Sequence, residues 1–309
     1  MRPLRQEDLK NADHIMRLAF GTFLGVPDPA NFGEGIDHVK TRWLADPNAA
    51  FCAEADGELV GSNFVTKWGS FGFFGPLTVR PDLWDRGIAK LLLEPTMELF
   101  KKWGVSHAGL FTFAHSPKHL GLYQKFGFWS RFLTPIMSKP VKLNNDSGEW
   151  SKFSDVPDVE KQRYLMERRS LTGSIYEGLD LEREITAARD QRLGDTVLLW
   201  ERETLVGFAV CHCGPGTEAG RDTCYVKFGA VRGESEAENH FDRLLNACEE
   251  LAATHGMASV IAGVNTACHN AYRRMIARGF HTDFQGVLML RPNEPSFDRH
   301  ECYVMCDLR

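Results

Sequence analysis

The sequence has no apolar run near the ~20 residues that a membrane-spanning helix needs. Its first residues, MRPLRQEDLKNADH, have no apolar core behind the basic residues, so no secretory signal is expected. A surplus of basic residues is also missing, because 36 Lys and Arg stand against 41 Asp and Glu, for a net charge of −5. These absences predict a cytoplasmic protein that binds neither a membrane nor a nucleic acid.

Cysteine is too scattered to indicate a disulfide framework. The eight cysteines are spread over 309 residues, which is typical of reduced thiols in a cytosol. The densest group is CHCG at residues 211–214, where strand alternation puts Cys211 and Cys213 on one face and His212 on the other. Three such side chains cannot converge on one ion, so no metal site is predicted.

The chain is about twice as long as a usual domain, and it contains one plan of elements twice. Residues 49–69 and 195–214 both read as hairpins, the first with an Asp56-Gly57 turn. Two helical segments precede each hairpin, and a strand, a long helix, a buried strand, a short helix and a last strand follow it. This order predicts an α/β fold class: two tandem domains, each with a mixed, mostly antiparallel central sheet flanked by helices.

The natural linker between the halves is the polar, turn-rich segment at residues 139–152. It predicts domains at residues 1–140 and 141–309. The first holds 16 basic against 14 acidic residues and the second 20 against 27, so the negative charge belongs to the second half. A solvated acidic surface explains that excess most simply.

The stretch LTVRPDLWDRGIAKLLL at residues 77–93 puts small residues at the start of a helix. A helix N-terminus offers unpaired N–H groups and a partial positive charge, so it can bind a pyrophosphate without cationic side chains. Gly87 and Ala89 permit the close approach that such an anion needs. Taken alone, the stretch is explained more simply by a tight turn. Deeper in the same helix, Pro95 is expected to kink or interrupt it.

With its neighbours, this stretch resembles the GNAT superfamily of acyl-CoA-dependent N-acyltransferases. The likeness rests on RPLRQEDL at the start, DGELVG in the first hairpin, VRPDLWDRGIAKLLL, and LYQKFGF in the last helix of the first half, in this order. Both halves look like copies of that fold, so the resemblance covers nearly the whole chain. It implies transfer of an acetyl or other short acyl group from acyl-CoA, as co-substrate, to an amine, most simply a small molecule.

The resemblance also assigns roles to residues of the first half. Tyr123 occupies the position of the general acid that protonates the leaving thiolate, although a core tyrosine would fit the helix equally well. Trp84 stands where the family has Arg or Gln, and Arg86 would compensate by facing a phosphate. Backbone N–H groups of residues 77–79 would meet the oxyanion and the pantetheine arm. The implied cofactor-binding residues are Leu77, Thr78, Val79, Trp84, Asp85, Arg86, Gly87, Ile88, Ala89, Lys90 and Ser116.

A general base is not identified by the sequence. The strand FGFFGPLTV, where a glutamate often serves in relatives, has no carboxylate. An amine that arrives neutral needs no base. The nearby titratable residues, each also explained as a surface or capping residue, are Asp28, Glu34, Asp37, His38 and His115.

The second half has lost the matching residues. In an ungapped alignment of the halves, Asn239 and Phe241 replace the two small residues of the helix start, beside three glutamates. Bulk and negative charge both oppose a pyrophosphate there. Met275 takes the position of the tyrosine, and Tyr272 lies one turn earlier, out of frame. The sequence therefore predicts an active first domain and a degenerate second one that walls the acceptor site.

Two other interpretations stay open at this point. The chain could be a non-catalytic acyl-CoA sensor, or a GNAT-like protein that keeps the cofactor and changes the acyl chemistry. The sequence does not define the acceptor, the acyl chain length or the oligomeric state.

Overall fold

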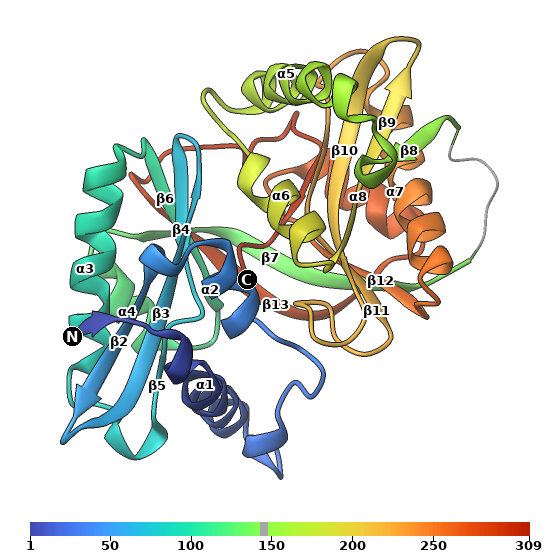
Figure 1. The fold of residues 1–309 in the computed structure, drawn as a ribbon. Coiled ribbons are helices and arrows are strands. Elements are labelled where there is room, and N and C mark those ends of the chain that lie inside the picture. The colour runs from blue at the N-terminus through green and yellow to red at the C-terminus, as the bar shows by residue number, and fades with distance from the viewer. Residues whose placement is uncertain (143–147) are drawn as a thin grey trace.

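The computed structural model describes residues 1–142 and 148–309 and has the two halves side by side, with strands passing between them (Figure 1). Part of the linker predicted at residues 139–152 therefore lies outside the described residues. No described helix is long and apolar enough to cross a membrane.

The first half follows the predicted order of elements. Its main elements are α1 (Leu9–Leu24), α2 (Val39–Ala45), β2 (Ala50–Ala55), β3 (Glu58–Trp68), β4 (Phe71–Phe74), β5 (Thr78–Val79), α3 (Ile88–Trp103), β6 (His107–Phe113), α4 (Pro117–Gln124) and β7 (Trp129–Pro140). At the predicted hairpin turn, Asp56 and Gly57 both have positive φ, 52° and 81°.

One expectation for the first half was wrong. The strand expected over residues 71–79 is divided into β4 and β5 at Gly75 and Pro76, because proline has no N–H to give to the ladder. The helix α3 is not interrupted at Pro95 but runs through it to Trp103.

The second half repeats the plan. Its main elements are α5 (Asp158–Ile175), α6 (Glu182–Asp190), β9 (Gly194–Glu201), β10 (Thr204–Cys213), β11 (Thr223–Val231), α7 (Ala237–Thr254), β12 (Ser259–Gly263), α8 (His269–Ala277) and β13 (His281–Arg291). Several short elements were not predicted. They are the strands β1 (Arg2–Pro3), β8 (Trp150–Lys152) and β14 (Val304–Cys306) and the 3-10 helices η1 (Gln6–Asp8), η2 (Pro29–Asn31), η3 (Pro47–Ala49), η4 (Pro81–Leu83) and η5 (Phe153–Asp155).

The described strands form one sheet, because the two halves exchange their last strands. The order is β1-β2-β3-β4-β6-β13-β7-β12-β11-β10-β9-β8, with β5 beside β3 and β14 beside β11. Strand β13 of the second half pairs with β6, and β7 of the first half pairs with β12. The division at residue 140 stays a prediction, and each half-sheet is completed by a strand from the other half.

A shared core reinforces this exchange. The buried cluster of the second half includes Trp68 and Phe71 from the first half. The rings of Trp68 and Phe228 lie 5.5 Å apart between centroids, in an edge-to-face arrangement. The hydrophobic effect therefore holds the two halves together as one packed unit.

The turn between β3 and β4 makes a tight backbone contact with the second half. Gly69 has a φ of +65°, and a Cβ there would lie 2.0 Å from the carbonyl oxygen of Gly178. The next residue, Ser70, donates its N–H to the same oxygen at 2.9 Å. Glycine is thus required at this position, because φ is positive and because a side chain has no space there.

Replacement of Gly69 by Ala is expected to lower the free energy of unfolding by about 2–4 kcal/mol, because the Cβ must push the halves apart. Urea denaturation measures the change. The matched control is Gly57→Ala, where φ is +81° and a Cβ meets no atom within 4 Å. In that variant the free energy of unfolding should fall by about 1 kcal/mol, because of the backbone conformation alone. Equal losses in the two variants would contradict a tight contact between the halves.

Candidate active site

The sheet opens where β4 and β6 part. Their parallel pairing ends at Phe73 and Gly109, after which β6 continues alone on that side to Phe113. The chain from β4 passes through Gly75 into β5, which pairs with β3 instead. The opening leads into a cavity of about 900 Å³.

Most of the predicted residues line this cavity. Arg86 does not, and its side chain is exposed. The residues that do are Leu77, Thr78, Val79, Trp84, Asp85, Gly87, Ile88, Ala89, Lys90, Ser116 and Tyr123.

The start of α3 forms one end of the cavity. Gly87 has a φ of +81° as the residue before the helix, and a Cβ there would meet no atom within 4 Å. The first helical bond runs from the Leu91 N–H to the Gly87 carbonyl at 3.2 Å. The N–H groups of Ile88, Ala89 and Lys90 therefore have no partner within the helix and are directed out of its end. An anion can approach these amides without steric hindrance.

Trp84 has a structural role in the loop before α3. Its indole N–H donates to the Val79 carbonyl at 2.8 Å, which ties the loop to β5. The Lys118 ammonium of α4 lies 2.6 Å from the Asp85 carboxylate and 5.5 Å from the centre of the Trp84 ring. Sequence reasoning missed Lys118, since only the fold brings α4 to the start of α3. This lysine lines the same cavity and brings a cation to the loop before α3, which is the role that the exposed Arg86 was expected to have.

Strand β5 presents backbone groups to the cavity. The Arg80 N–H donates to the Val60 carbonyl of β3 at 2.9 Å. Because bonding direction alternates along a strand, the N–H groups of Leu77 and Val79 point away from β3 and toward the opening. They can meet a carbonyl oxygen or a pantetheine amide. Ser116, which also lines the cavity, accepts from the His119 N–H at 3.4 Å and so caps α4.

Tyr123 lies on α4 with its ring 5.7 Å from that of Phe74. The residue is 7% exposed, and its hydroxyl makes no hydrogen bond to any described residue. Since the oxygen is not fully enclosed either, it opens to the cavity that the residue lines. Burial raises the pKa of Tyr123, so the phenol stays protonated and can act as a proton donor.

Of the candidate bases, His38 alone lines the cavity. Asp28 accepts from the Asn31 amide at 2.8 Å. Glu34 pairs with Arg221 at 3.0 Å, and Asp37 accepts the Lys40 N–H at 2.8 Å at the start of α2. The last candidate, His115, is exposed and stacks on Phe23 at 5.7 Å between ring centroids.

In the second half, another strand fills the equivalent opening. The parallel pairing of β11 and β12 ends at Val226 and Ala262. Directly beyond it, β14 pairs with β11, at Gly229 with Met305 and at Ala230 with Val304. In the alignment of the halves, this backbone corresponds to Leu77 and to Thr78, the first residue of β5. Phe241 is fully buried, with its ring 5.4 Å from that of Tyr303. Strand β14 thus fills the opening that stays free in the first half.

The CHCG segment ends β10 inside the core. Cys211 is fully buried, with its sulfur 4.0 Å from that of Cys248. His212 is 1% exposed, and neither ring nitrogen has a hydrogen-bond partner among the described residues. No three His, Cys, Asp or Glu side chains in the described part of the chain are placed to hold a metal ion.

Comparisons with known proteins agree with this geometry. Residues 15–128 match the model of the acetyltransferase (GNAT) family. No curated protein sequence matches the chain. A protein from Pyrococcus horikoshii proposed to be an acetyltransferase has a TM-score of 0.70 at 15% identity, over 99% of this chain and 93% of that chain. A tandem GNAT protein from the clavulanic acid biosynthesis pathway has a TM-score of 0.59 at 14% identity, over 96% of this chain and 98% of that chain.

A third solved structure is similar in fold. The GCN5-related N-acetyltransferase from Sphaerobacter thermophilus has a TM-score of 0.57 at 15% identity, over 96% of both chains. At these identities the likeness concerns the fold, which extends over both halves of the chain.

Proposed function

We propose that this chain, a protein with two tandem copies of the GNAT fold, is an acyl-CoA-dependent N-acyltransferase whose active site lies in the first half. The observation that carries the proposal is that one cavity contains both a site for the pyrophosphate and a proton donor. The free amides at the start of α3 lie at one end, and Tyr123 contributes a proton donor to the same space. The co-substrate is acetyl-CoA or another short acyl-CoA.

For each step that acyl transfer requires, the cavity offers a group with suitable chemistry. The amides of residues 88–90, with Lys118 beside them, would bind the pyrophosphate. The N–H groups of Leu77 and Val79 would bind the pantetheine arm and the oxyanion. Tyr123 would protonate the thiolate as the C–S bond breaks. These contacts support an enzyme over a sensor, because binding alone needs no proton donor.

The filled opening of the second half supports a single catalytic site. Strand β14 takes the backbone bonds of β11, and Phe241 fills the position of a small residue. The second half acts instead as a wall of the cavity, since Phe284, Leu308 and Arg309 line it.

The acceptor end of the cavity is rich in phenyl rings. The rings of Phe20 and Phe32 stack at 6.2 Å, and those of Phe23 and Phe113 lie 5.0 Å apart. Among the described residues that line the cavity, Asp85 is the one carboxylate, and it pairs with Lys118. A multiply charged cation would find no counter-charge here. We therefore propose a small amine with an apolar or aromatic body as the acceptor.

A panel of amines with acetyl-CoA, followed by free-thiol release, tests the proposal. Phenylalkyl and alkyl monoamines should have a kcat/KM at least roughly 10-fold above that of spermidine, because their apolar bodies are buried against the phenyl rings. Thiol release without any added amine would favour altered acyl chemistry. Tight acyl-CoA binding with no release for any amine would favour a sensor.

A further inference from the structure

His38 lies where a loop of the first half meets a loop of the second. The second-half loop, residues 214–222, joins β10 to β11 and carries Glu218. Its Gly216 N–H donates to the Gly35 carbonyl at 2.7 Å, and the Asp37 N–H donates to the Thr217 carbonyl at 2.8 Å. These two bonds, one on each side of Ile36, hold the loops in a fixed register. The backbone of the second half thus fixes the position of His38.

The two ring nitrogens of His38 have different surroundings. Nδ1 is buried, has no hydrogen-bond partner among the described residues, and lies 3.4 Å from the Glu218 carboxylate. Nε2 makes no hydrogen bond to a described residue either, but it is not among the enclosed atoms. The side chain is 21% exposed and lines the cavity. One edge of the imidazole therefore faces a carboxylate, and the other edge is open to a ligand.

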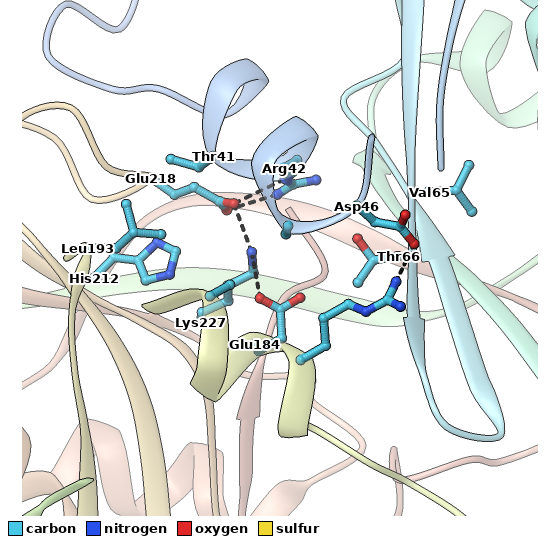
Figure 2. Close-up of a pocket in the computed structure, with 13 residues that line it drawn as sticks. Thr41, Arg42, Asp46, Val65, Thr66, Glu184, Leu193, His212, Glu218 and Lys227 are labelled. Atoms are coloured by element: carbon cyan, nitrogen blue, oxygen red, sulfur yellow. Dashed lines mark hydrogen bonds and ion pairs between the residues drawn. The ribbon is translucent and has the colours of Figure 1, made fainter. Parts of the chain in front are cut away.

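Glu218 is held as an anion by two buried cations (Figure 2). The Arg42 guanidinium lies 2.9 Å from its carboxylate, and the Lys227 ammonium lies 2.8 Å from it. Lys227 also pairs with Glu184 at 3.1 Å, so the network is close to neutral. Burial alone would raise the pKa of Glu218, but the charges of Arg42 and Lys227 outweigh it and hold that pKa well below its usual range.

We infer that His38 is the base that deprotonates the incoming amine and that Glu218, supplied by the second half, is the residue that positions it. The inference rests on the proposed acyltransferase function. A carboxylate facing Nδ1 favours the tautomer with the proton on Nδ1, which leaves the Nε2 lone pair free toward the cavity. The degenerate half is then required for catalysis as well as for the core.

Two residues, His38 and Tyr123, take part in all the proton transfers of the reaction. An ammonium acceptor gives one proton to His38 Nε2, and the freed lone pair attacks the thioester carbonyl. The C–N bond forms, the C–S bond breaks, and the thiolate takes the proton of the Tyr123 hydroxyl. The second N–H proton of the attacking nitrogen returns to the tyrosinate, and His38 releases its proton to water.

Burial of His38 keeps its imidazole neutral at pH 7. Burial lowers the pKa of His38 below the ordinary 6.5, Glu218 opposes that change, and Arg42 and Arg309 add to it. The neutral form is the base. The kcat/KM should therefore fall as the pH drops through this lowered pKa, and it should be level above it up to the pKa of the acceptor.

The test is the pH profile of kcat/KM for wild type, His38→Gln and Glu218→Gln with a phenylalkylamine. In His38→Gln, kcat/KM at pH 7 should be roughly 100-fold lower than in wild type, and it should rise with pH up to the pKa of the amine. Glu218→Gln should move the acid limb to lower pH, because the charge that raises the pKa of His38 is gone. An aromatic hydrazine, which is already neutral at pH 7, should be acylated by His38→Gln at close to the wild-type rate.

Controls separate this inference from the proposed function. The exposed His14 on α1 does not line the cavity, so His14→Gln should behave as wild type. If Glu218→Gln fails to fold, the contrast in His38→Gln between a lost rate with the phenylalkylamine and a retained rate with the hydrazine decides alone. Activity in wild type with an unchanged profile in His38→Gln would overturn the inference and leave the acyltransferase intact. No activity in wild type would overturn the proposed function itself.

Discussion

Replacement of Gly87 by Glu should weaken acyl-CoA binding roughly 100-fold while the protein stays folded. The side chain would stand over the amides of Ile88, Ala89 and Lys90, where no protein atom lies within 4 Å of its Cβ. A carboxylate there both fills the space and repels the pyrophosphate. Loss of one or two charge-assisted bonds costs about 3 kcal/mol, which is roughly a 100-fold rise in the dissociation constant. Isothermal titration with acetyl-CoA measures it.

The other end of the same helix provides the matched control. Gly104 ends α3 with a φ of +63°, and a Cβ there also meets no atom within 4 Å. Gly104→Glu therefore has a similar backbone cost of about 1 kcal/mol but leaves the amides open. It should bind acetyl-CoA like wild type. Binding that survives in Gly87→Glu would place the cofactor elsewhere on the molecule.

Replacement of Tyr123 by Phe should lower kcat by roughly 10²–10⁴ with little change in acetyl-CoA affinity. The hydroxyl opens to the cavity and makes no hydrogen bond to a described residue, so its removal leaves no broken protein contact. Because burial raises the pKa of Tyr123, this donor should not titrate in the working range of pH, and the pH profile should keep its shape. Initial rates of thiol release and acetyl-CoA titration separate the two effects.

The second half contains the control for this substitution. Tyr272 of α8 lies near the position that matches Tyr123 in the alignment of the halves. Tyr272→Phe should leave the rate unchanged. A large loss in Tyr272→Phe, with none in Tyr123→Phe, would move the proton donor to the second half and contradict a first-half active site.

Local patterns predicted the elements and the start of α3 because each depends on a few neighbouring residues. The Asp56-Gly57 turn and the glycine before α3 both have a local cause. The motif order then located Tyr123 in the same cavity as Gly87. Local patterns failed at Pro76, where a strand that was predicted to be continuous is divided.

The sequence by itself determined the two-copy α/β plan, the small residues at the helix start and their loss in the second half. Hydrophobic periodicity, turn residues and side-chain size each depend on residues that are close together in the chain. They can therefore be recognised without knowledge of the tertiary structure. The tertiary structure alone decided the exchange of β7 and β13, the filling of the second opening by β14, and the approach of Glu218 to His38. These contacts join residues far apart in the chain, and long-range packing rather than local preference selects them.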